Sequence, residues 1–312
     1  MKIGILTQPL SYNYGGILQN CALQIFLKKY GHESITIDQA EIKTPLYVRI
    51  KADIKTLILK AIGKGKHRSF SGYRPSKKEM ELIRKNTDDF IKRHIVHTPP
   101  INSERCIRKI VKSNKFDAFI IGSDQCWRPK YNKFIQFMYL SFLSNSCKSL
   151  RISYASSFGT DTWEYDSDLT ETCRKLIAKF DAISVREKSA IDLCKKHFGV
   201  DAVQVLDPTM LLSKEEYIDL INSEENSHDT GDLFYYILDP NKKKLDFLSF
   251  ITEKTNHHNY TVLPKYQTEN RTKFNIKNQI DDCIYPHVTS WLKGILDAEM
   301  VITDSFHSEF SV

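Results

Sequence analysis

Six clusters of side chains capable of chemistry follow apolar segments in this sequence of 312 residues. They begin at Gly15, Ser123, Ser156, Arg186, Asp207 and Asp304, and the last of them ends at His307. An arginine can hold a carboxylate or a phosphate through two parallel hydrogen bonds. A histidine, whose ordinary pKa lies near neutrality, can donate or accept a proton. Structural proteins also place polar turns after strands, but repeated Asp, Arg, Glu and His favour a binding or catalytic cleft.

The first cluster is a glycine pair at the start of a predicted helix. Residues 2–7 form a short apolar segment typical of a buried strand, and Gly15 and Gly16 precede apolar residues at helical spacing. Glycine allows a ligand to approach the backbone closely, and a helix N-terminus favours negative charge. The loop therefore suits a phosphate or a carboxylate, or it is a plain tight turn. It matches neither the Walker loop nor the G-x-G-x-x-G fingerprint.

The clusters need a scaffold that brings the ends of several strands together. Apolar strand candidates alternate with helical patterns, which indicates an α/β fold with a parallel sheet covered on both faces. One helix is predicted from Ser76 to about His94, where Ser76 and Glu79 form a capping box. Another is predicted over Ser103–Ser113. Because ligands of open parallel sheets bind outside the carboxyl ends of the strands, the clusters lie where a site is expected.

The length of the chain indicates two domains. A polar stretch at residues 223–232, SEENSHDTGD, is the candidate boundary. We predict an N-terminal Rossmann-like domain over 1–225, with a basic helical insertion near 45–100, and a C-terminal Rossmann-like half-domain over 226–312. Only roughly 80 residues follow the boundary, so the second domain is expected to be small or truncated.

The formal net charge of +7 is concentrated in one segment. Residues 51–79 contain nine Lys or Arg against two acidic residues, and apolar residues within 48–66 fall on one helical face. This pattern is typical of a short helix that associates weakly with an anionic membrane surface. A solvated connector, or a helix that packs on the protein itself, fits the same residues.

Seven scattered cysteines without a C-x-x-C pair predict neither a disulfide framework nor a zinc site. Four histidines (His94, His97, His257 and His258) lack a supporting ligand set, and we expect no metal. No stretch approaches the roughly 20 apolar residues that span a bilayer, and the N-terminus lacks a secretory signal. We therefore expect a cytoplasmic protein, with a peripheral place at the inner face of the membrane left open.

Six motifs occur in a fixed order: SYNYGGILQNCALQ, FDAFIIGSDQCW, ISYASSFG, ISVRE, VLDPTMLL and VITDSFH. In this order the chain resembles the polysaccharide pyruvyl transferase family, from Gly4 to His307. The resemblance implies two Rossmann-like domains facing each other, similar to the GT-B glycosyltransferase arrangement. It also implies transfer of pyruvate from phosphoenolpyruvate onto sugar hydroxyls as a ketal. The chain departs from the family at its end, where Ser308 stands in place of a common glycine.

The donor implied by this resemblance carries a phosphate and a carboxylate, and its enol carbon must accept a proton. Arg186 is the expected anion clamp, unless it only pairs with Glu187. His307 is the expected acid–base catalyst, or it holds the phosphate as an imidazolium. Asp304 either orients His307 or caps the following helix. The expected donor-binding residues are Arg186, Ser305, Phe306, His307, Gly15 and Gly16.

The acceptor sugar is expected to lie beside the GSDQCW motif. Asp124 could act as a base toward a sugar hydroxyl, or it could form the turn after its strand. Gln125 could contact the sugar, whereas Trp127 and Tyr14 could stack on a sugar face or pack in the core. The expected catalytic residues are thus His307 and Asp124, and the expected acceptor residues are Asp124, Gln125, Trp127 and Tyr14.

The resemblance implies phosphoenolpyruvate as a co-substrate and no further cofactor. The expected acceptor is a sugar of a polysaccharide or of its lipid-linked oligosaccharide precursor, and no nucleic-acid partner is expected. Two other functions stay open on the residues alone. A nucleotide-sugar glycosyltransferase of GT-B shape would use similar loops for a diphosphate, and a non-catalytic carbohydrate-binding protein could use the same fold.

Overall fold

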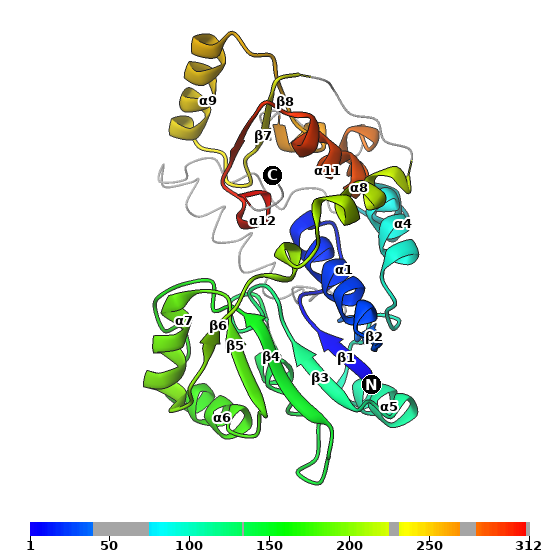
Figure 1. Cartoon of the computed structure of the whole chain (residues 1–312), viewed down its shortest axis with the longest axis vertical. Coiled ribbons are helices and arrows are strands. Elements are labelled where there is room, and N and C mark those ends of the chain that lie inside the picture. Colours follow the sequence, from blue (N-terminus) through cyan, green and yellow to red (C-terminus); the bar gives the residue numbers. More distant parts are fainter. Residues whose placement is uncertain (40–74, 133, 225–230, 269–278, 310–312) are drawn as a thin grey trace, which may run out of the picture.

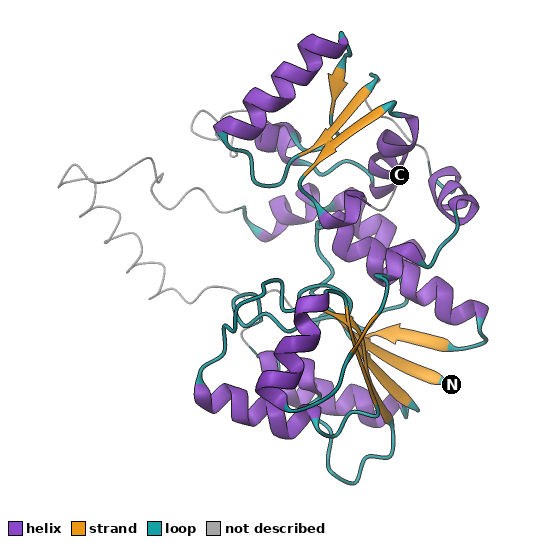
Figure 2. Cartoon of the chain, turned by 60° about the vertical axis from the view of Figure 1, so that its left-hand side comes forward, coloured by secondary structure: helices purple, strands orange, loops and turns teal. Residues whose placement is uncertain are grey.

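The computed structural model describes residues 1–39, 75–132, 134–224, 231–268 and 279–309. Two α/β domains lie one above the other along the longest axis of the molecule (Figure 1). Several helices lie between the two sheets, as the turned view in Figure 2 shows. The basic segment 48–66, for which membrane association is predicted, lies outside the described residues.

The first domain is built on a six-stranded parallel sheet in the order β2-β1-β3-β4-β5-β6. Its strands are β1 (Lys2–Leu6), β2 (Glu33–Thr36), β3 (Ala118–Ile121), β4 (Leu150–Ser156), β5 (Ala182–Val185) and β6 (Val203–Gln204). The chain goes from β1 to one side for β2 and then to the other side for β3. Such a reversal opens a crevice at the carboxyl ends of the strands, where α/β proteins bind ligands.

Helices accompany these strands, and several of them begin after a capping Ser, Asn or Asp in the sequence. They are α1 (Tyr14–Lys29), α3 (Lys77–Ile83), α4 (Lys85–His94), α5 (Glu104–Asn114), α6 (Ser167–Ile177), α7 (Lys188–Leu193) and α8 (Lys214–Asn222). Short helical turns complete the domain: η1 (Ile135–Tyr139), η2 (Cys194–Phe198) and η3 (Pro208–Met210). The predicted capping box of Ser76 and Glu79 is present, and Ser103 caps α5. The helix predicted from Ser76 to about His94 is divided in two at Arg84.

The second domain carries a three-stranded parallel sheet in the order β8-β7-β9. Its strands are β7 (Leu233–Tyr236), β8 (Asn259–Tyr260) and β9 (Met300–Thr303). Its helical elements are α9 (Lys242–Thr255), α10 (Lys265–Thr268), η5 (Asp281–Cys283), α11 (Val288–Asp297) and α12 (Phe306–Glu309). Two parallel-sheet domains with helices between the sheets confirm the predicted α/β fold of Rossmann-like, GT-B-like design.

One hydrophobic core joins the two domains. It contains buried side chains of α1, α4 and α8 from the first part of the chain and of β7 and α11 from the second. Tyr14 packs its ring near Trp291 and donates a hydrogen bond to the carbonyl of Pro286 at 2.9 Å. The predicted boundary at 225/226 falls on residues outside the described ones, and α8, which precedes it, already packs on α11.

All seven cysteine thiols are free, and five of them are buried. In the described part of the chain, no group of three or more His, Cys, Asp or Glu side chains is placed to hold a metal ion. None of the described helices combines the length and the apolar character needed to cross a bilayer.

Candidate functional site

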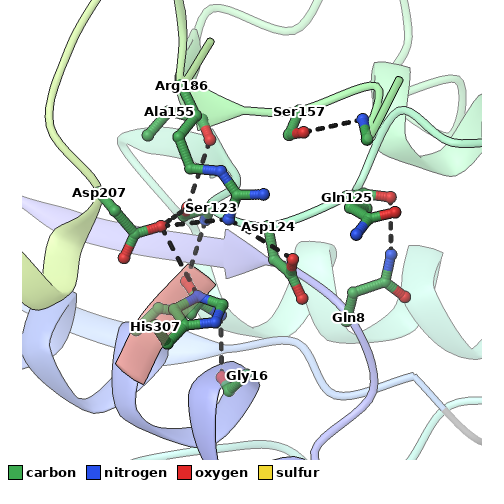
Figure 3. Close-up of polar contacts among 12 residues, drawn as sticks. Gln8, Gly16, Ser123, Asp124, Gln125, Ala155, Ser157, Arg186, Asp207 and His307 are labelled. Carbon is green, nitrogen blue, oxygen red and sulfur yellow. Dashed lines mark hydrogen bonds and ion pairs between the residues drawn. The ribbon is translucent and has the colours of Figure 1, made fainter. Parts of the chain in front are cut away.

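The site gathers at the carboxyl ends of the first sheet, around the buried carboxylate of Asp207. This residue follows β6 and is only 1% exposed. Its Oδ2 atom accepts a hydrogen bond from Ser123 Oγ at 2.5 Å and lies 3.5 Å from Nη1 of Arg186. The same atom lies 3.8 Å from Nε2 of His307 (Figure 3). One carboxylate oxygen therefore contacts groups that come from both domains.

The other oxygen of Asp207 holds the carboxylate in place. Oδ1 accepts hydrogen bonds from the backbone N–H of Thr209 at 3.0 Å and from its hydroxyl at 2.9 Å. Asp207 is thereby the N-cap of η3, and Pro208 at the first position of that turn suits the same start. Because both oxygens are engaged, Asp207 is a fixed acceptor and not a mobile surface acid.

Arg186, at the end of β5, lies among three carboxylates. Its Nη1 atom is 3.6 Å from Asp124 and 3.5 Å from Asp207, and its Nε donates to Glu187 at 2.8 Å. Burial acts to lower the pKa of Arg186, but these carboxylates outweigh burial and raise the pKa above its ordinary value. The pairing with Glu187 foreseen as the alternative role is thus present. A bound anion would have to share the guanidinium with these groups.

Phe306 covers one side of this guanidinium. The Cζ atom of Arg186 lies 4.1 Å from the centre of the Phe306 ring, at a distance typical of a cation–π contact. Phe306 belongs to α12 of the second domain, whereas Arg186 belongs to the first. The predicted donor-binding residues Arg186, Phe306 and His307 are therefore brought together across the two domains.

The glycine pair at the start of α1 has a steric role toward His307. A Cβ atom on Gly15 would overlap Nδ1 of His307 and would lie 2.6 Å from its Cγ. A Cβ atom on Gly16 would meet no atom closer than 3.6 Å. The N–H of Gly16 instead donates to Oδ1 of Asn13, the N-cap of α1, at 3.3 Å. Glycine at position 15 is thus required because the imidazole lies against the first turn of α1.

Asp124 and Gln125 follow β3 in the loop that contacts Ser157 after β4. The backbone of Asp124 has φ +69°, a value that Asp tolerates better than most residues, and its carbonyl accepts the N–H of Ser157 at 3.0 Å. The Gln125 side chain accepts a hydrogen bond from Arg128 at 3.1 Å, and its carbonyl accepts one from Gln8 at 2.8 Å. Asp124 therefore faces the Arg186 cluster, whereas Gln125 is held by its neighbours.

Trp127 and Tyr14 have packing roles in this structure. Both rings are fully buried. Trp127 stacks on Tyr139 with ring centres 5.3 Å apart and donates its indole N–H to the Met138 carbonyl at 3.2 Å. Tyr14 lies in the core between the domains. The predicted stacking on a sugar is corrected here, because neither ring presents a face to a ligand.

Asp304 does not orient His307. Its carboxylate accepts the backbone N–H groups of Leu238 at 2.7 Å and Asp239 at 3.1 Å, and it pairs with Lys244 at 2.6 Å. Burial would raise the pKa of Asp304, but Lys244 and the two N–H groups lower it below its ordinary value. Asp304 therefore anchors the loop after β7. Ser305 is buried beside it, with its N–H bonded to Thr303 Oγ1 at 3.0 Å.

Three residues of the cluster were not among the predicted site residues, although the sequence carried a signal for each. Ser123 and Asp207 each follow a predicted strand, and Glu187 follows Arg186 at the end of another. Glu187 accepts hydrogen bonds from Arg186 and from Ser157 Oγ, each at 2.8 Å. Their position near strand ends predicts that they lie at the same edge of the sheet, but their residue types do not show that their side chains converge on Arg186.

A model of the polysaccharide pyruvyl transferase family matches residues 13–308, nearly the whole chain. The chain belongs to this family. The match includes every element around Arg186, Asp207 and His307, and so the cluster described above lies wholly within the family domain. A search of curated protein sequences found no match.

Solved structures with overall likeness to this family member include nucleotide-bound proteins. They are UGT73P12 of Glycyrrhiza uralensis with glycyrrhetinic acid 3-O-monoglucuronide (TM-score 0.42, 9% identity), S. aureus MnaA with UDP (0.45, 10%) and a ugt transferase of Siraitia grosvenorii with UDP (0.37, 8%). The alignments cover 98–99% of this chain and 74–79% of those chains. The fold is defined by the two parallel sheets of the chain itself.

Proposed function

We propose that this polysaccharide pyruvyl transferase takes pyruvate from phosphoenolpyruvate and places it as a ketal on two hydroxyls of a sugar. The acceptor sugar belongs to a polysaccharide or to its lipid-linked precursor, on which the protein acts from the cytoplasmic side. The observation that carries the proposal is the meeting of Arg186 and His307 at one oxygen of Asp207. This meeting supports the proposal because a guanidinium can bind an anion and an imidazole can transfer a proton, and both residues lie within the matched residues 13–308.

The reaction requires one proton to reach the methylene carbon of the donor. His307 supplies it, and the adjacent carbon then becomes open to attack by a sugar hydroxyl. Phosphate leaves with the electron pair of the broken carbon–oxygen bond, and a second hydroxyl closes the ketal. The two hydroxyl protons end on the new methyl group and on the released phosphate. Asp124, which faces the same cluster, is the proposed base toward a hydroxyl.

The charges of the cluster place a condition on donor binding. Among the described residues, Arg186 already pairs with three carboxylates, those of Asp124, Glu187 and Asp207, so negative charge exceeds positive charge around it. An anionic donor adds negative charge, so a second positive group is needed beside Arg186. The N-terminus of α1, whose first turn contacts His307, supplies part of this positive potential through its dipole.

A donor screen by thermal unfolding tests this function. A ligand that binds only the folded state stabilises it by about 2.7 kcal/mol at 100 times its dissociation constant. We expect phosphoenolpyruvate to raise the unfolding temperature and nucleotide sugars to leave it unchanged. A shift with a nucleotide sugar alone would favour a glycosyltransferase. A shift with oligosaccharides and with no donor would favour a carbohydrate-binding protein.

A further inference from the structure

A polar cavity lies at the amino ends of the strands of the first sheet, at the end of the sheet opposite the Arg186 cluster. It is formed around the start of β4 and the residue before β5, whereas the cluster lies beyond the ends of the strands. The cavity has a volume of about 350 Å³. The lining residues used below are Asn145, Cys147, Lys148, Arg151, Lys179 and Asp181.

Arg151 is the buried member of this lining, with 5% of its surface exposed. Its Nη2 donates to the Ser144 carbonyl at 2.9 Å, and its backbone N–H donates to Asp181 Oδ2 at 2.8 Å. Its Nη1 is buried and donates no hydrogen bond to any residue that the structure describes. Burial of a cation without a counter-charge is costly. Within the described ranges, no carboxylate oxygen lies within 4.0 Å of the guanidinium nitrogens.

The rest of the lining adds positive charge. Lys148 and Lys179 are exposed at the cavity, and Lys179 donates to Oδ1 of Asn145 at 2.8 Å. Asp181 supplies the one carboxylate of the lining, and it is engaged with the Arg151 backbone. Three cationic side chains therefore face one acid around a space that admits a small ligand. Arginine and lysine together suit the oxygens of a phosphate group.

We propose that this cavity binds a phosphate-class oxyanion, either free or as part of a phosphorylated small molecule. The anion would lie against Arg151 and supply the counter-charge that the described residues lack, and the two lysines would close the cavity around it. This site is separate from the donor site at Arg186, and it does not depend on the proposed reaction.

Cys147 provides a local readout because it lines the cavity and is partly exposed. The other partly exposed thiol is Cys106, so a Cys106→Ser protein isolates the signal. The rate of Cys147 alkylation by iodoacetamide is followed by mass spectrometry at constant ionic strength, with chloride as the reference anion. If alkylation needs the empty site, phosphate at about ten times its dissociation constant should slow it about tenfold.

Variants of the lining residues test whether the slower alkylation of Cys147 comes from an anion bound in the cavity. Arg151→Gln should abolish the protection, and Lys179→Gln should weaken it. Lys175→Gln is the matched control, because Lys175 is an exposed lysine of α6 that does not line the cavity. If Arg151→Gln does not fold, a Lys148→Gln and Lys179→Gln double variant decides, since both side chains are exposed.

Three probes distinguish a free anion from a phosphorylated small molecule as the ligand. They are inorganic phosphate, inorganic sulfate and glucose 6-phosphate. Protection by inorganic phosphate supports a free ion, and protection by glucose 6-phosphate alone supports a phosphorylated small molecule. Absence of protection by all three would overturn the proposal, as would equal protection in Arg151→Gln. The assay contains no donor and no acceptor, so its failure leaves the proposed transferase function untouched.

Discussion

Asp207 is the residue on which the site depends most. Asp207→Asn would keep the shape of the side chain but remove the charge that faces Arg186 at 3.5 Å and the acceptor that receives Ser123 Oγ. We expect the free energy of unfolding to fall by about 1–3 kcal/mol, because buried partners lose their acceptor. Urea unfolding measures this change. Asp201→Asn is the control, since Asp201 is exposed and pairs only with Lys195 in the described structure; an equal change in both variants would contradict the role of Asp207.

His307 is expected to act mainly as a proton donor. His307→Gln keeps a hydrogen-bonding side chain but cannot transfer a proton at neutral pH. Turnover, measured as phosphate released from phosphoenolpyruvate in the presence of a saccharide acceptor, should fall by about 10²–10⁴-fold. Donor affinity should fall by a much smaller factor. An equal loss of affinity and turnover would show that His307 acts as a phosphate clamp instead.

The residue types predicted some of the site residues, whereas the roles of others depend on burial and local bonding that the sequence does not show. Arg186 and His307 could be singled out because only a few residue types bind anions or transfer protons near neutrality. Trp127 and Tyr14 could not be assigned correctly, because an aromatic ring in a loop or first helical turn carries no sign of whether it is buried. Asp207 could not be predicted as a site residue, because helix capping explains an Asp before a Pro equally well.

At the scale of elements, the first turn of α1 and the last helix α12 must approach closely. Gly15→Ala would place a methyl group on the His307 ring, whereas Gly16→Ala adds the same group with Asn13 as its nearest neighbour at 3.6 Å. Displacing a catalytic group by about 1 Å can cost about 100-fold in rate. We expect turnover to fall by about that factor in Gly15→Ala and by clearly less in Gly16→Ala. Similar rates in the two variants would mean that the α1–α12 contact does not position His307.

The loop after β1 is tied to the end of β2 by Asp38, whose carboxylate accepts the Leu10 N–H at 3.0 Å. Burial raises the pKa of Asp38 from 3.8 to about 6, although the Leu10 N–H and nearby cations act to lower it. The folded state therefore holds this proton more tightly than the unfolded state. Stability from this group is present below about pH 4 and is lost as the pH rises to about 6.

Asp38→Asn is expected to remove this pH dependence. The difference in unfolding free energy between wild type and Asp38→Asn should fall by on the order of 2 kcal/mol from about pH 4 to pH 6. Asp161→Asn, at an exposed aspartate, is the reference for the loss of a surface charge. Parallel pH profiles for wild type and Asp38→Asn would refute the assignment.

Local signals predicted where several elements begin, but not how they are ordered. Ser76 and Ser103 could be recognised as helix starts because a hydroxyl before a helical pattern accepts the free N–H groups of the first turn. The division at Arg84 could not be recognised, because neither Gly nor Pro marks it. The order β2-β1-β3-β4-β5-β6 depends on pairing between distant strands, which no local pattern encodes.

For the whole molecule, two domains and parallel sheets could be predicted from length and from the alternation of strands and helices. The shared core could not be predicted, because apolar faces of α1, α4 and α8 look the same in sequence whether they cover their own sheet or a second domain. Where the domains meet, Arg186 and Asp207 of the first domain contact Phe306 and His307 of α12 in the second. The site therefore depends on how the domains pack as well as on its own residues.

The central claim is that residues of both domains hold one donor. Calorimetric titration of phosphoenolpyruvate into wild type, Arg186→Lys, His307→Gln and the surface control Lys175→Gln tests it most directly. We expect binding to wild type and to the control with equal affinity. Binding to Arg186→Lys should be at least about tenfold weaker, because an ammonium cannot reproduce the planar fork of a guanidinium, and binding to His307→Gln should be weaker by a smaller factor. Equal affinity of all four proteins, or no binding to wild type, would contradict the account.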